Sequence, residues 1–307
     1  EVTFMDYILT AESLWKSYKG FHALSGLNMH LPKGAIYGLV GRNGAGKTTL
    51  IRLICGLQVP TSGSYTLFGL DSASKEIHRA RRRMGAVVET PSIYLDLSAA
   101  DNIKEQYRVL GVPSDDGVGE LLELVGLADT GKKKARNFSL GMRQRLGIAI
   151  ALAGNPDLLV LDEPVNGLDP QGIIETRELI LKLNRERQIT VLISSHILDE
   201  LSRLATHYGF IDGGRMVKEV SAQELEGACR KCLRVEVTDT RALARVLDGM
   251  GIDYKILTEG KADLFAQPVI SRLSAALAEE GCELLSAQER DESLESYFIN
   301  LVGGGSK

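Results

Sequence analysis

Residues 41–48 read Gly41-Arg42-Asn43-Gly44-Ala45-Gly46-Lys47-Thr48, which matches the phosphate-binding pattern G-x-x-x-x-G-K-[ST]. Glycine lets backbone N–H groups turn inward around a polyphosphate, where a side chain would collide. Lys47 offers a positive charge to the outer phosphates, and the hydroxyl of Thr48 is a ligand for Mg²⁺. The apolar run 35–40 predicts a strand before the loop. Residues 49–54 predict a helix whose positive end faces the phosphates.

The composition of the chain limits the class of protein. Its 307 residues suffice for two domains of roughly 100–200 residues each, and 44% hydrophobic with 25% charged residues is typical of a soluble globular protein. The net charge of −4 provides no basic field, so we expect no nucleic-acid partner. No apolar run approaches the about 18 residues of a membrane span.

Strand and helix patterns alternate along the first two thirds of the chain, which predicts an α/β core with a largely parallel sheet. Helical periodicity covers residues 98–130. Expected strands are 8–15, 24–31, 35–40, 63–68, 84–88, 158–161, 190–194 and 208–212, and further helices are 140–152, 173–184 and 197–205.

The pattern changes near residue 225. Strands at 233–238, 254–257, 263–266 and 283–286 and helices at 241–250 and 269–279 give the order β-α-β-β-α-β, typical of a ferredoxin-like domain, and a final helix is expected over 293–301. We therefore expect a domain at 1–225 and a small accessory α+β domain at 226–302, regulatory or dimer-supporting, with a flexible tail at 303–307.

Two acids follow the apolar strand 158–161. Ligands of open α/β sheets sit at such strand ends. Beside a phosphate loop, Asp162 is placed to hold Mg²⁺, directly or through water, and Glu163 to polarise a water for attack on a γ-phosphate.

Two further positions are candidates for phosphate contact. Ser139 is a good N-cap for the helix 140–152, with Gly141 in its first turn. The residues alone do not separate a plain cap from a helix N-terminus that receives a phosphate. His196 follows the strand 190–194, where contact with a γ-phosphate is favoured over a structural role.

Together these motifs resemble the nucleotide-binding subunit of an ATP-binding cassette (ABC) transporter over roughly residues 8–220. Residues 41–48 resemble the Walker A loop and Leu158–Asp162 the Walker B strand. Glu163 aligns with the family's catalytic glutamate, His196 with its switch histidine, and Gly167-Leu168-Asp169 with its D-loop. Tyr18 falls where the family stacks an aromatic ring on adenine.

The chain departs from the commonest family pattern at two places. The signature Leu-Ser-Gly-Gly-Gln is here Phe138-Ser139-Leu140-Gly141-Met142, and the Q-loop glutamine is Glu89. Both departures are similar to those of the bacitracin- and lantibiotic-type exporter branch of bacteria, which also has a C-terminal extension of about this size.

The resemblance implies an ATPase with a P-loop α/β cassette, whose helical subdomain covers about 90–155. Two subunits, a homodimer or a pair of ATPase subunits, would face head to tail at the cytoplasmic face of the membrane and drive a separate permease. Pro91–Leu97 would contact a permease helix, with ordinary local core packing as the alternative role of this segment. The implied cofactors are ATP and Mg²⁺. The implied catalytic residues are Glu163, His196 and Lys47, the metal ligands are Thr48, Glu89 and Asp162, and the nucleotide-binding residues are Tyr18, Gly41, Asn43, Gly44, Ala45, Gly46, Lys47, Thr48, Thr49, Ser139, Gly141 and Asp169.

Two other functions are alternatives to transport. A soluble ABC ATPase acting on DNA would carry a long coiled coil between Thr48 and Ser139, which the spacing excludes, and ribosome-acting types usually carry two cassettes. A P-loop kinase would not need Ser139, His196 and the D-loop together. The cargo and its direction of travel are not encoded in these motifs, so export of an antibiotic or peptide is what the branch resemblance implies.

Overall fold

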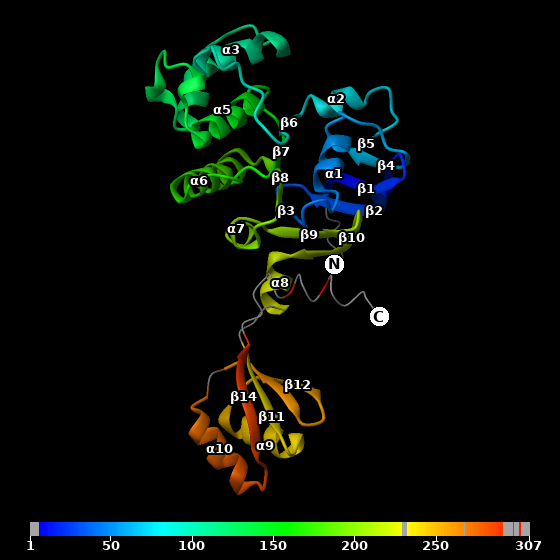
Figure 1. Cartoon of the computed structure of the whole chain (residues 1–307), viewed down its shortest axis with the longest axis vertical. Coiled ribbons are helices and arrows are strands. Elements are labelled where there is room, and N and C mark those ends of the chain that lie inside the picture. Colours follow the sequence, from blue (N-terminus) through cyan, green and yellow to red (C-terminus); the bar gives the residue numbers. More distant parts are fainter. Residues whose placement is uncertain (1–5, 229–231, 267, 291–296, 298–300, 302–307) are drawn as a thin grey trace. The chain divides into compact units, whose positions relative to one another are not determined.

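The computed structural model describes residues 6–228, 232–266, 268–290, 297 and 301 (Figure 1). The chain forms two compact units that divide between Ala222 and Gln223. The helix expected over 293–301 and the tail 303–307 lie outside the described residues, apart from Tyr297 and Leu301. Within the described residues, no helix is both long and apolar enough to cross a lipid bilayer.

The first unit is built on a six-stranded sheet in which five strands are parallel, as the alternating pattern predicts. Its three central strands are buried along their whole length, because their side chains are packed on both faces. The sixth strand pairs antiparallel at one edge. In spatial order the strands are β10 (Arg215–Ser221), β9 (His207–Asp212), β3 (Ile36–Val40), β8 (Thr190–Ser195), β7 (Leu158–Asp162) and β6 (Met84–Val87).

A second, antiparallel sheet packs with helix α1 (Lys47–Ile54) in one hydrophobic core. The apolar side chains of α1 join residues of β1 and β2 in this core, so the helix that follows the phosphate loop is anchored on its inner face. The strand order is β2 (Phe21–Pro32), β1 (Tyr7–Tyr18), β4 (Ser62–Leu67) and β5 (Leu70–Asp71), and the short helix α2 (Ile77–Arg81) follows β5.

Helices fill the chain between β6 and β7. The periodicity over 98–130 resolves into α3 (Ala99–Leu110) and α4 (Gly117–Leu124), because Gly111 ends α3 in the left-handed conformation, with φ +73°. Two 3₁₀ turns (Ala128–Thr130 and Ala135–Asn137) lead into α5 (Leu140–Leu152), which has the bounds expected from sequence. Helices α6 (Pro170–Arg187) and α7 (Leu198–Ser202) follow β7 and β8.

The second unit has the element order β-α-β-β-α-β expected from the sequence. Its antiparallel sheet runs in the order β12-β13-β11-β14, and alternate residues of β11 (Leu233, Val235 and Val237) share one buried core with the two helices. The elements are β11 (Cys232–Val237), α9 (Thr240–Met250), β12 (Tyr254–Thr258), β13 (Lys261–Leu264), α10 (Ile270–Glu279) and β14 (Leu284–Arg290), preceded by α8 (Ala222–Ala228).

Candidate nucleotide-binding site

The glycine loop joins β3 to α1, and its glycines are required by the backbone. Gly44 and Gly46 have φ values of +81° and +110°. A Cβ on Gly46 would lie 2.7 Å from the carbonyl oxygen of Ala23, and a Cβ on Gly41 would lie 2.6 Å from that of Ile211. The loop therefore passes close to two other strands, which only glycine permits at these positions.

Lys47 is held at the first turn of α1 with its charge directed back over the loop. The side chain is only 5% exposed. Its Nζ donates hydrogen bonds to the carbonyl oxygens of Gly41 (2.7 Å) and Arg42 (3.3 Å). No side chain caps the N-terminus of α1, so the first N–H groups of the helix face the loop as donors for an anion.

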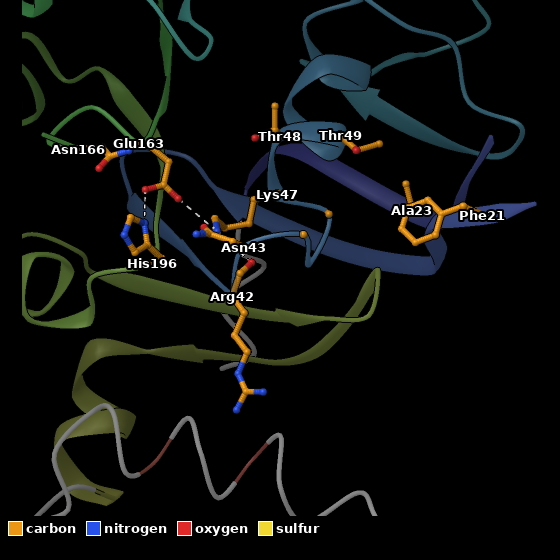
Figure 2. A pocket seen from close by; sticks show the side chains of 12 residues that line it. Phe21, Ala23, Arg42, Asn43, Lys47, Thr48, Thr49, Glu163, Asn166 and His196 are labelled. Carbon is orange, nitrogen blue, oxygen red and sulfur yellow. Dashed lines mark hydrogen bonds and ion pairs between the residues drawn. The ribbon is translucent and has the colours of Figure 1, made fainter. Parts of the chain in front are cut away.

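The loop forms one wall of a cavity of about 460 Å³. The opposite walls come from the start of β2 and from the chain just beyond the carboxyl ends of β7 and β8 (Figure 2). The lining residues are Phe21, Ala23, Arg42, Asn43, Gly44, Gly46, Lys47, Thr48, Thr49, Glu163, Asn166 and His196.

Glu163 contacts both Lys47 of the glycine loop and His196, which follows β8. Its Oε1 lies 3.2 Å from Nζ of Lys47, and its Oε2 accepts a hydrogen bond of 2.5 Å from Nδ1 of His196. Figure 2 shows the carboxylate between these two side chains. The backbone of Glu163 is left-handed, with φ +50°, a conformation that is uncommon outside glycine and is found at functional sites.

Asp162 lies behind the cavity at the end of β7. It is 1% exposed, and its Oδ1 accepts a 2.6 Å hydrogen bond from Oγ of Ser194 on β8. Burial raises the pKa of the nearby Cys55 thiol to about 12, so this cysteine stays protonated and is no thiolate ligand.

The structure brings most of the predicted residues together. Asn43, Gly44, Gly46, Lys47, Thr48, Thr49, Glu163 and His196 line the cavity, while Gly41 and Ala45 complete the buried turn of the loop. The sequence reasoning did not single out Phe21, Ala23, Arg42 or Asn166.

Two predicted residues point elsewhere. The hydroxyl of Tyr18 donates a 2.5 Å hydrogen bond to Oε1 of Gln58, and the ring does not line the cavity. The neighbouring aromatic that does is Phe21, which pairs with Tyr18 across the turn between β1 and β2. Glu89 forms an ion pair with Arg52 on α1 and does not line the cavity either.

The remaining predicted residues lie at helix starts outside the cavity. Ser139 is the exposed N-cap of α5, and its Oγ accepts from the N–H of Met142 at 3.2 Å. Asp169 is the exposed N-cap of α6, and its Oδ1 accepts from the N–H of Gly172 at 3.1 Å. Neither they nor Gly141 reach the loop within this chain.

A glycine loop with a buried lysine, an aspartate at the end of one strand and a glutamate–histidine pair define the class of P-loop nucleoside triphosphatases. Residues 24–166 match the model of the ABC transporter family. The chain is 40% identical to the bacitracin transport ATP-binding protein BcrA of Bacillus licheniformis, covering 98% of this chain and 99% of that one. It is 45% identical to the lantibiotic transport ATP-binding protein SrtF of Streptococcus pyogenes, covering 69% of this chain and 90% of that one.

Solved structures show the same fold. The bacterial ABC transporter cassette MJ0796, solved as a dimer, is 25% identical with a TM-score of 0.64, covering 70% of this chain and 98% of that one. A second structure of MJ0796 is bound to ADP and phosphate. The chain belongs to the ATP-binding subunits of ABC transporters, and it binds and hydrolyses ATP.

Proposed function

We propose that this chain powers a separate membrane permease that exports an antibiotic or peptide of the bacitracin or lantibiotic kind. The observation that carries the proposal is the extent of the similarity to the bacitracin transport protein, which covers 98% of this chain and so includes the second unit as well as the cassette. In this role the chain lies at the cytoplasmic face of the membrane, attached through its permease.

The loop and α1 bind the phosphates of ATP. Lys47 contacts the outer phosphates, and the backbone N–H groups at the start of α1 donate to them. We assign the adenine to Phe21, because this ring lines the cavity and is 59% exposed, whereas Tyr18 is turned toward Gln58. Stacking on adenine tolerates any aromatic ring, so phenylalanine suits this role.

Replacing Phe21 with alanine is expected to weaken ATP binding by about 1–3 kcal/mol, roughly 5- to 150-fold, because a base-stacking surface is lost. Tyr18→Ala is the matched control and should change affinity less, while Phe21→Tyr should bind like the original chain. Fluorescence titration with an ATP analogue measures all three. The reverse ranking of the two alanine variants would return the adenine contact to Tyr18.

The residues present fit Mg²⁺. Hydroxyl and carboxylate oxygens, here those of Thr48 and Asp162, are the ligands this cation prefers. Among the described residues no cluster of three or more His, Cys, Asp or Glu is present, which suits a cation held by one or two side chains together with phosphate oxygens and water. Bound there, Mg²⁺ would neutralise phosphate charge. Glu89 could join these ligands only by leaving Arg52.

Glu163 acts as the base that orients and polarises the attacking water, and His196 holds its carboxylate. The carboxylate contacts Lys47. A triphosphate carries more negative charge than one carboxylate and so replaces it on the lysine. The bond to His196 then keeps Glu163 beside the terminal phosphate.

A second copy of the chain completes the site. Ser139, Gly141 and Asp169 lie outside the chain's own cavity, and Ser139 and Asp169 are exposed at helix N-termini, which favour anions. In a head-to-tail pair, Ser139 and Gly141 of one subunit would face the γ-phosphate held by Lys47 of the other. The dimer of the MJ0796 cassette supports this arrangement by analogy.

The permease contact is assigned to the segment Pro91–Leu97. It follows Glu89 directly, and its side chains include the exposed large apolar residues Tyr94 and Leu95. Exposed apolar residues of this kind mark a protein contact when they are grouped. Movement of Glu89 toward the nucleotide would therefore be transmitted to the permease.

The export proposal is tested in cells. The chain is expressed with a multi-span permease, chosen as one whose gene neighbours its own, in a host sensitive to bacitracin and lantibiotics. The concentration that inhibits growth should rise for at least one of these compounds, because pumping lowers its level at the target. The Glu163→Gln variant, expressed with the same permease, should give no rise. Unchanged sensitivity with a co-purifying permease would show that another cargo is carried.

A further inference from the structure

Ser194 lies directly beside both acids, at the end of β8. It is fully buried, with 0% exposure, and the parallel register of β7 and β8 pairs it with Asp162. Its Oγ donates to Oδ1 of Asp162 at 2.6 Å. The same oxygen accepts from the N–H of Glu163 at 2.9 Å, and the carbonyl oxygen of Ser194 lies 3.2 Å from that N–H.

The direction of these hydrogen bonds is fixed by chemistry. The amide of Glu163 can only donate, so the hydroxyl of Ser194 must accept from it. An ionised carboxylate can only accept, so the single hydroxyl proton goes to Asp162. One side chain thus satisfies two buried polar groups on the neighbouring strand, and neither can turn to water without losing this partner.

The neighbouring serine does not share this position. Successive side chains of a strand point to opposite faces, and Oγ of Ser195 accepts from the N–H of Ile197 at 2.9 Å at the start of α7. The two serines are both buried and adjacent, but only Ser194 touches the acids. Ser195 therefore provides a matched control.

We propose that Ser194 is the positioning residue for the two acids: its hydroxyl orients the carboxylate of Asp162 toward Mg²⁺ and fixes the left-handed backbone of Glu163, so that the glutamate points into the cavity. The inference rests on the roles proposed above for Asp162 and Glu163. Loss of the hydroxyl removes this hydrogen bond from the Asp162 carboxylate, but it leaves Glu163 its longer bond to the Ser194 carbonyl.

The test compares Ser194→Thr with Ser194→Val. Threonine and valine have nearly the same size and both suit a strand, so they differ at this site only in the hydroxyl. Thr should keep the activity of the original chain. Val should lower kcat by about 10- to 100-fold with unchanged affinity for ATP in EDTA, since the phosphate loop is intact. Ser195→Ala should keep the original kcat.

A second readout does not depend on turnover. Bound ATP should raise the Tm of the protein, in part through Mg²⁺. The Mg²⁺ concentration that gives half of this magnesium-dependent rise is measured for each variant. It should increase about tenfold in the Val variant and stay the same in the Thr variant. If Val fails to fold without ligand, Ser194→Ala replaces it in the same comparison.

Equal kcat and equal Mg²⁺ dependence in the Thr and Val variants would overturn the role of Ser194. Glu163→Gln is assayed in parallel, so that a failure of the catalytic role of Glu163 is distinguished from a failure of the positioning role of Ser194. Normal hydrolysis by Glu163→Gln would refute the role of Glu163, while the Mg²⁺ titration still decides whether Ser194 orients Asp162. A stalled Glu163→Gln with an unaffected Val variant would refute the positioning role alone.

Discussion

Replacing Glu163 with glutamine is expected to leave ATP binding intact and to lower the hydrolysis rate by about 100- to 10,000-fold, the usual contribution of a general base. The amide has nearly the shape of the carboxylate but cannot draw a proton from water. It also removes the negative charge that lies 3.2 Å from Nζ of Lys47, so ATP should bind at least as tightly as before. Phosphate release and ATP titration measure the two effects separately.

The same variant should accumulate a dimer. With MgATP bound and not hydrolysed, the head-to-tail pair has no step that reopens it, and size-exclusion chromatography should show twice the monomer mass. Adding Ser139→Ala to this variant is the control, because it removes the hydroxyl offered to the partner's nucleotide; the dimer should then be lost while each chain still binds ATP. Hydrolysis at the original rate in Glu163→Gln would remove Glu163 from its catalytic role.

Replacing Lys47 with alanine is expected to weaken ATP binding by at least about 1.5–3 kcal/mol, roughly 10- to 150-fold, which is the cost of losing a charged hydrogen bond. The lysine is buried at the first turn of α1 and is held over the loop by the carbonyl of Gly41, so its charge is fixed where the outer phosphates are expected. Hydrolysis should fall in parallel, because the γ-phosphate loses its contact.

The control for Lys47→Ala is Lys182→Ala on the exposed surface of α6, which changes the net charge of the chain equally. Isothermal titration with MgATP and with an uncleavable analogue measures both variants. Affinity that survives in Lys47→Ala at the level of Lys182→Ala would contradict the assignment of the phosphate loop.

The parts of the fold that the sequence predicts are mostly encoded by short local patterns. The buried strands around the loop and the cap at Ser139 were readable from short patterns, and α5 begins and ends at the expected residues. The strand β10 was missed, although Gly213 and Gly214 have positive φ and form the tight turn after β9. Its sequence alternates weakly, because an edge strand buries little of either face.

The features of the site that the sequence did not predict depend on how segments far apart in the chain are placed against one another. The motif order indicated that Lys47, Glu163 and His196 converge, since strand ends of a parallel sheet share one edge. Which of two aromatic rings reaches the cavity depends on the turn at Gly20, with φ +75°, and not on the motif. The contact of Ser194 with both acids depends on the register between β7 and β8, which no local pattern encodes.

The ion pair between Lys47 and Glu163 links nucleotide binding to the proposed base. Both residues line one cavity, so a triphosphate that binds the lysine competes with the carboxylate for the same charge. In the role proposed for Glu163, the change of partner on Lys47 and the release of the carboxylate toward water would be one step. Nucleotide binding and readiness of the base would then be coupled through a single contact.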